Sequence, residues 1–320
     1  MTNVYSKNEW DPLKKVLVGV ADHAQIPNDK SVRVVNYADV SDENQIPYGS
    51  YPQKVIDESN QDLETFVSFL QGEGIEVVRP DRIHVNYYNY CPRDSTIICG
   101  DRSIPTPMSI NSRYNEWKSY EQHLSNVTDL SVIHPEGVYN DECIGNPDIL
   151  ALSEKEPAFD AANVIRANDD LLYLVSNSGN KKGAELLRQT LGVNVHLLEN
   201  VYSYMHIDST VCFLREGLLL LNPSRIKSID VLPKVFQSWD VIWCPEPVDI
   251  GYYKNYNNSS PWLNMNLLSI SPDKVVIEEH QHNLRKELEK HSIECAMLPM
   301  RHSRTLGGGF HCATLDIIRE

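Results

Sequence analysis

The segment LGGGFHCATLD, residues 306–316, joins a nucleophile to an unusual stretch of backbone. Cys312 follows three glycines and a histidine, and a thiol that has lost its proton is a strong nucleophile. Glycine weakens regular secondary structure, so three in a row indicate a conformation or a close approach that a Cβ atom would prevent. Two interpretations are open: a flexible turn that leads into a strand, or a tight passage that presents Cys312 to a small molecule.

Titratable side chains that could act together with such a thiol occur in short polar motifs elsewhere in the chain. MHID contains His206 and Asp208, FDAA contains Asp160, and CPRD ends at Asp94. Each motif comes just before an apolar run that is typical of a short strand. Asn264 stands in a fourth such place, in WLNMNLL. A single aspartate in such a place is most often a turn residue, but four such positions are harder to explain in this way.

Simpler interpretations of the acidic residues and the cysteine remain open. Asp94 and Asp208 could form structural ion pairs with Arg93 or Arg215. A cysteine chosen at random is most often a buried and inert thiol, as expected for Cys99 and Cys212 in apolar strands.

A zinc site is a further alternative. His206, Asp208 and Cys312 are all residue types that bind zinc, but no fourth ligand stands at a recognised spacing. We therefore expect no metal and no effect of chelators. His311 would point away from Cys312 in an extended chain, so we assign it no catalytic role.

A repeated unit must position these groups. Two short apolar runs, an amphipathic helix and a third apolar run recur over residues 160–198, 206–243 and 262–298, with a period of about fifty residues. Apolar spacing predicts helices over about 181–191 and near 283–291. The same spacing predicts two more helices, one through Leu63, Phe66, Val67 and Leu70 and one through Leu232, Val235, Phe236 and Trp239.

A ring of such units would direct the start of each first strand toward a common centre. Arg93 and Asp94, Asp160, His206 and Asp208, and Asn264 stand at these starts. The repeat therefore predicts that polar side chains from distant segments meet there.

Composition limits the class of protein. The chain has 320 residues, 41% of them hydrophobic, and no linker-like stretch, so we expect one domain over residues 1–320. A net charge of −15 argues against nucleic acid or an anionic membrane surface as a partner. The N-terminal segment has no signal-like apolar region and no run is long enough to span a membrane. Seven scattered cysteines then indicate reduced thiols in the cytoplasm.

Six motifs in order resemble one known family. NEWDPLKKVLVG, CPRD, EPAFDAANVIRA, MHIDSTV, LLNPSR and LGGGFHCAT together resemble the amidinotransferases of the glycine and inosamine-phosphate type, and they extend from Asn8 to Cys312. The resemblance implies the pentein fold, a fivefold pseudosymmetric α/β propeller of ββαβ-like units around a central active site.

The resemblance also implies roles for individual residues. Cys312 would be the nucleophile, His206 the general acid and base, and Asp160 the carboxylate that orients the histidine. Asp94 and Asp208 would hold a guanidinium group, which matches carboxylates through paired hydrogen bonds. The remaining expected substrate contacts are Arg225 for the substrate α-carboxylate, Met205, Ser259, Ser260 and Gly308.

The sequence departs from the family pattern in a few places. Asn163 stands where close relatives often carry a second acid after FDAA, and residues 25–52 and 245–262 match poorly. We expect these two segments to set the choice of acceptor, and residues 252–258 together with Met205 to cover the site.

The reaction implied is transfer of the amidino group of L-arginine to Cys312, release of L-ornithine, and transfer to an acceptor amine. The expected partners are these small molecules, with no cofactor, and a homodimer is left open. Two alternatives remain: an arginine deiminase-like hydrolase that produces citrulline, and a catalytically silent arginine-binding protein.

Overall fold

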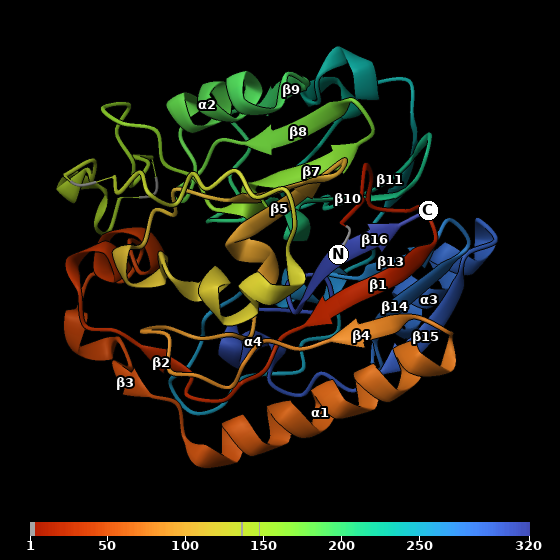
Figure 1. Ribbon diagram of the computed structural model, residues 1–320, viewed down its shortest axis with the longest axis horizontal. Helices are drawn as coiled ribbons and strands as arrows, with labels where there is room; N and C mark the ends of the chain where they lie inside the picture. Colours follow the sequence, from red (N-terminus) through yellow and green to blue (C-terminus); the bar gives the residue numbers. More distant parts are fainter. Residues whose placement is uncertain (1–3, 136, 147) are drawn as a thin grey trace.

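The computed structural model describes residues 4–135, 137–146 and 148–320 of the chain (Figure 1). Four three-stranded sheets share one plan, in which an antiparallel pair is extended by a third, parallel strand. Three of them are β7 (Val164–Ala167), β8 (Asp170–Leu174) and β9 (Asn194–Leu198); β10 (Val211–Arg215), β11 (Leu218–Leu221) and β12 (Asp240–Trp243); and β13 (Leu268–Ser271), β14 (Lys274–Glu278) and β15 (Glu294–Leu298). These sheets confirm the repeat predicted over residues 160–298.

The fourth sheet joins distant parts of the sequence. It consists of β16 (Thr314–Arg319), β1 (Leu13–Val18) and β4 (Glu76–Val78), with β1 in the centre. A two-stranded sheet, β5 (Thr96–Cys99) and β6 (Arg102–Pro105), follows in the sequence, and β2 (Gln25–Ile26) pairs with β3 (Gly49–Ser50). β16, the strand that follows Cys312, therefore pairs with β1, the first strand among the described residues.

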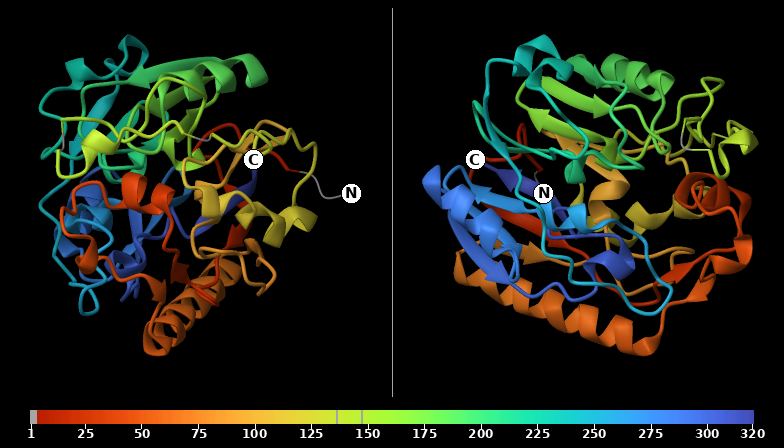
Figure 2. Two further views of the ribbon diagram at one scale, coloured as in Figure 1. Left: turned by 90° about the vertical axis from the view of Figure 1, so that its left-hand side faces the viewer. Right: turned by 180° about the vertical axis from the view of Figure 1, so that it is seen from behind.

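Helices cover the outer edges of the sheets. α1 (Gln53–Gly72), α2 (Lys181–Leu191) and α3 (His282–Lys290) confirm three predicted helices, and a short α4 (Ser303–Leu306) precedes the glycine run. In Figures 1 and 2, α1 in orange and α2 in green lie at opposite edges of the molecule in every view. No helix among residues 4–135, 137–146 and 148–320 is long and apolar enough to cross a membrane.

The predicted helix through residues 232–239 is wrong. The structure has two separate three-residue 3₁₀ turns there, Ile229–Val231 and Lys234–Phe236. Pro233 explains the difference, because proline has no backbone N–H and disfavours helical dihedrals in the preceding residue. Leu232 is extended accordingly, with φ −76° and ψ 155°. Leu232 and Phe236 are nevertheless buried, so the apolar spacing located core residues without a regular helix.

One-turn 3₁₀ helices place the polar motifs just before the strands. η3 (Pro92–Asp94) precedes β5, η7 (Ala161–Asn163) precedes β7, η8 (Ile207–Ser209) precedes β10, and η11 (Pro261–Met265) precedes β13. Asp160 and His206 are the residues that cap the N-termini of η7 and η8. Because η3 contacts η7, η7 contacts η8 and η8 contacts η11, residues far apart in the sequence come together.

A buried ionic network contacts the backbone next to Cys312. Arg166 contacts Glu9 at 2.8 Å and Asp316 at 2.6 Å, and Arg93 contacts Asp316 at 2.7 Å. Arg93 also donates from Nε to the backbone oxygen of His311 at 2.8 Å. The arginine next to Asp94 therefore does not pair with it, and instead fixes the backbone beside the nucleophile. Buried charges without such partners would be strongly destabilising.

Candidate active site

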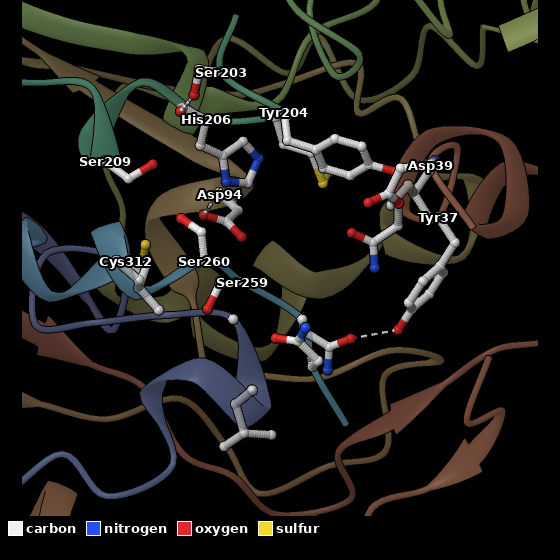
Figure 3. A pocket seen from close by; sticks show the side chains of 18 of the residues that line it. Tyr37, Asp39, Asp94, Ser203, Tyr204, His206, Ser209, Ser259, Ser260 and Cys312 are labelled. Atoms are coloured by element: carbon white, nitrogen blue, oxygen red, sulfur yellow. Dashed lines mark hydrogen bonds and ion pairs between the residues drawn. The ribbon is translucent and has the colours of Figure 1, made fainter. Parts of the chain in front are cut away.

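A cavity of about 490 Å³ opens where the short helices meet, and its wall includes Cys312, His206, Asp94, Asp208 and Arg225. Figure 3 shows Cys312, Asp94 and His206 grouped on one side of this cavity, with Tyr37 and Asp39 across from them. The structure therefore brings together side chains that the sequence separates by more than two hundred residues.

Cys312 is buried in a polar pocket at the base of the cavity. Its Sγ donates to Asp208 Oδ2 at 3.0 Å, and Asn266 Nδ2 donates to the same sulfur at 3.1 Å. Asn266 Oδ1 also accepts the backbone N–H of Cys312 at 3.1 Å. The neighbouring thiol of Cys91, burial and the charge of Asp208 together raise the pKa of Cys312 well above its usual value. The thiol is therefore protonated at neutral pH.

The glycines allow two close contacts behind the nucleophile. A Cβ atom on Gly308 would lie 2.5 Å from Cys91 Sγ and 3.1 Å from Cys312 Cβ. A Cβ atom on Gly309 would lie 2.8 Å from Asn266 Oδ1, which accepts the Cys312 N–H. The run is thus explained by close packing against Cys91 and Asn266. Gly308 itself is not in the cavity wall, where the neighbouring Gly307 is found instead.

His206 lies between two carboxylates. Its Nε2 is 3.0 Å from Asp160 Oδ2, and its Nδ1 is 3.7 Å from Asp94 Oδ1. Asp160 is fully buried, and its other oxygen accepts from the Ser109 backbone N–H at 3.1 Å. Burial alone would lower the pKa of His206, but Asp94, Asp160 and Asp208 outweigh it and raise that pKa to about 9. The imidazole therefore carries a proton that it can donate at neutral pH.

Asp94 has one satisfied and one unsatisfied oxygen. Oδ2 accepts from Arg113 Nη1 at 3.1 Å, whereas Oδ1 is buried and has no hydrogen-bond partner among the residues that the structure describes. Burial raises the pKa of Asp94. Asp94 does have an arginine partner, although Arg113 was not one of those considered from the sequence. The bare Oδ1 atom nevertheless requires a donor, which an incoming cation could supply.

Asp208 links the nucleophile to the adjacent histidine. Its Oδ2 contacts Cys312 Sγ at 3.0 Å and His311 Nδ1 at 3.1 Å. Although burial opposes it, the hydrogen bond from His311 holds the pKa of Asp208 well below its usual range. The expectation that His311 points away from the thiol is wrong, because residues 310–313 form turns and not an extended strand. His311 contacts the same carboxylate as Cys312.

Arg225 provides a cation in the wall of the same cavity. Its Nη1 donates to Ser203 Oγ, to the backbone oxygen and Oγ of Ser209, and to Thr210 Oγ1 at 2.7–3.1 Å. Burial lowers the pKa of Arg225 to about 10. No carboxylate contacts its guanidinium within the part of the chain that the structure describes. A half-buried arginine of this kind, with only neutral hydrogen-bond partners among the described residues, is suited to a carboxylate ligand.

Met205, Ser259 and Ser260 also line the cavity, as do Asn255, Asn257 and Asn258 of the segment expected to cover the site. Asn258 ties that segment to residues 25–52. Tyr37 Oη donates to Asn258 Oδ1 at 2.7 Å, and Asn258 Nδ2 donates to Tyr51 Oη at 2.8 Å. The two segments that match the family poorly therefore meet at one side of the cavity.

Sequence reasoning missed Asn266, Arg113 and Cys91. In the unit over residues 262–298, the sequence pointed to Asn264. The side chain of Asn264 instead donates to the backbone oxygen of Val248 at 2.8 Å. The segment LNMNLL contains both asparagines, and only the geometry of η11 selects Asn266. Arg113 and Cys91 carry no sequence signal, because their roles depend on contacts with distant segments.

The cysteines are free thiols, and one possible metal group includes two of them. Cys91, Asp94 and Cys312 offer ligand atoms within 4.8 Å of one another. This trio differs from the set of His206, Asp208 and Cys312 considered from the sequence. It has three members, whereas structural zinc has four ligands. That the protein needs no metal stays a prediction, for which activity after dialysis against a chelator is the test.

A thiol, a protonated histidine and several carboxylates in one cavity define a site for cysteine-dependent chemistry on a cationic substrate. No family model matches the chain. It is 41% identical over 340 aligned positions to inosamine-phosphate amidinotransferase 1 of Streptomyces griseus, covering 100% of this chain and 98% of that protein. It is 30% identical to the L-arginine:L-lysine amidinotransferase of Pseudomonas savastanoi pv. phaseolicola, covering 99% and 94%. The chain belongs to the amidinotransferase family.

Solved structures agree with this assignment. The inosamine-phosphate amidinotransferase StrB1 of Streptomyces griseus superposes with a TM-score of 0.93 at 39% identity, over 99% of this chain and 97% of that chain. DDAH from Pseudomonas aeruginosa superposes with a TM-score of 0.60 at 15% identity, over 95% and 99%, which shows the fold alone. The predicted α/β pentein fold is therefore confirmed.

Proposed function

We propose that the protein transfers the amidino group of L-arginine to an acceptor amine through a covalent amidino-Cys312 intermediate, with release of L-ornithine. One observation carries this proposal. Among the described residues, the cavity wall contains a thiol and a carboxylate oxygen that has no hydrogen-bond partner, and it also contains an arginine that has no carboxylate partner. L-arginine has the complementary pattern, with a guanidinium at one end and an α-carboxylate at the other.

In the first half-reaction, Asp94 and Asp208 bind the guanidinium and Arg225 binds the α-carboxylate. Cys312 must lose its proton to solvent before it attacks, because His206 is already protonated. Carboxylates alone oppose this loss, whereas the arriving cation favours the thiolate. The sulfur then attacks the central guanidinium carbon while His206 donates its proton to the departing nitrogen of ornithine. The bond between that nitrogen and the carbon breaks, which leaves a cationic amidino group on sulfur.

In the second half-reaction, the neutral His206 accepts a proton from the acceptor amine. The amine attacks the amidino carbon, and the thiolate of Cys312 leaves. Asp160 keeps the imidazole oriented through its bond to Nε2 in both steps. Release of ornithine before the acceptor binds predicts ping-pong kinetics.

Two broader proposals accompany this reaction. The units are arranged as a fivefold propeller forming one domain, which is supported by the successive contacts of η3, η7, η8 and η11 and by the contacts of α4 with η11 and of β16 with η3. The protein acts in the cytoplasm, as its free cysteines suggest.

Incubation with isotopically labelled L-arginine and no acceptor tests the reaction. We expect about one ornithine per active site and a labelled amidino adduct on Cys312, located by peptide mass spectrometry. The His206→Gln variant should give far less of both at the same pH. Sustained citrulline formation at the rate of the best amine transfer would instead identify a hydrolase. Binding of arginine without any adduct or ornithine would identify a silent binding protein.

A further inference from the structure

The wall of the cavity across from Cys312 carries a second, separate acidic group. Asp39 lies there beside Tyr37 and Tyr204 (Figure 3). It is exposed, and its contacts include its backbone N–H, which donates to Tyr204 Oη at 3.4 Å. Asp39 takes part in none of the ion pairs found among the described residues, so its carboxylate has no cationic partner there.

The cationic side chains of the cavity wall, Arg113, Arg225 and His206, make their hydrogen bonds and ion pairs with residues other than Asp39. Arg113 donates to Glu116 from both Nε and Nη2, at 2.9 and 2.7 Å, and its guanidinium lies 5.1 Å from the ring centres of Tyr87 and Tyr88. Arg225 is held near His206 and Asp208 by Ser203, Ser209 and Thr210. Among the described residues that line the cavity, no lysine and no further arginine stands near Asp39.

Neutral hydrogen-bonding groups complete this side. Tyr37, Tyr51 and Asn258 are joined by hydrogen bonds, and Gln45 and Asn257 also line the wall. Such groups bind ammonium and hydroxyl groups but do not neutralise an anion. Arg33 donates to the backbone oxygens of Tyr37 and Val40, on either side of Asp39, but forms no ion pair with its carboxylate among the described residues. An exposed carboxylate in this wall attracts a cation and repels a phosphate or a carboxylate.

We propose that Asp39 forms an acceptor subsite for a second ammonium group, so that the acceptor is a diamine or a related amine whose far end is cationic. This inference rests on the amidino transfer proposed above and specifies its acceptor. One amine attacks the amidino-Cys312 carbon, while the other end of the molecule contacts Asp39. Residues 25–52 thus contribute a specificity-determining side chain that does not touch the reacting atoms.

Matched acceptors test the subsite. A series of α,ω-diamines of increasing length is compared with the monoamine, the amino alcohol and the ω-amino acid of the same chain length. The first half-reaction is measured separately as the ornithine burst without acceptor. We expect a diamine to have the highest kcat/KM and the ω-amino acid the lowest. Replacement of Asp39 by asparagine should reduce the diamine-to-monoamine ratio about twofold to fivefold, as expected for one exposed ion pair.

The controls separate the two proposals. Asp42→Asn makes the same change of charge three positions away, outside the cavity wall, and should leave the ratio unchanged. A normal ornithine burst with equal transfer to all four kinds of acceptor would overturn the subsite alone. So would a preference for the ω-amino acid, or an equal effect of both substitutions. Loss of the burst in the parent protein would instead overturn the proposed donor chemistry.

Discussion

Replacing Asp94 by asparagine should lower the pKa of His206, measured in the absence of substrate. Asp94 Oδ1 lies 3.7 Å from His206 Nδ1. A pair of unit charges at that separation interacts by about 4.5 kcal/mol at an effective dielectric constant of about 20, which corresponds to about three pKa units. Arg113 already compensates part of the charge of Asp94. We therefore expect a decrease of about one to two units from the value of about 9.

Histidine NMR measures this change directly. The ring resonance of His206 is assigned by its absence in His206→Gln, and its titration is compared between the parent and Asp94→Asn. His280, whose pKa is raised by its hydrogen bond to Glu278, serves as an internal control and should titrate identically in both. A His206 pKa that changes by less than about 0.3 unit would refute the assignment of its charge to Asp94.

The same shift predicts how stability depends on pH. The pKa of His206 is higher in the folded protein than in the unfolded chain, where it is about 6.5. Its contribution to folding stability is therefore complete below about pH 6.5 and is lost as the pH rises through about 9. Denaturant unfolding should show that Asp94→Asn is more costly at pH 6 than at pH 10 for this reason.

Four further substitutions test the geometry of the site. Cys312→Ser should abolish turnover while the circular dichroism spectrum stays that of the parent, and activity within about tenfold of the parent would contradict the role of the thiol. Arg225→Gln should reduce the preference for arginine over agmatine, which lacks the carboxylate, by about tenfold or more in kcat/KM. Asn266→Ala should lower kcat, since it removes both contacts to Cys312, and an unchanged kcat would exclude a positioning role. Gly308→Ala should destabilise the fold by about 1–3 kcal/mol in denaturant unfolding, and Cys91→Ala should restore part of that loss in the double variant; no recovery would show that Cys91 is not the group in conflict.

Local sequence patterns predicted the elements that end on clear signals. α2 is preceded by its N-cap residue Asn180, whose side chain accepts from the Gly183 N–H, and is followed by its C-cap residue Gly192, with φ +72°. The helix predicted through residues 232–239 has no such boundary signals, and Pro233 interrupts it. Apolar periodicity reports burial, and burial alone does not require a regular helix.

Only those residues of the candidate site that belong to a recognisable motif could be predicted from the sequence. Asp160 and His206 each precede a one-turn helix, so the short motifs around them identified positions that the fold then brought together. Asn266 contacts Cys312 across 46 residues of sequence, and Arg113 reaches Asp94 across 19. Such pairings are set by how the units pack, and a hydrogen-bonding side chain in an irregular segment gives no periodic signal.

The pairing of β1 with β16 has a consequence for the order of folding. The carboxylates and the histidine belong to units whose strands pair with near neighbours in the sequence, whereas β16 pairs with the strand at the opposite end of the chain. Closing so long a loop costs more entropy, and contacts between distant residues form slowly. Cys312 stands directly before β16, so a partly folded chain can hold the guanidinium-binding carboxylates while it still lacks the nucleophile. We therefore expect catalytic activity to appear late in refolding, after most of the secondary structure has formed.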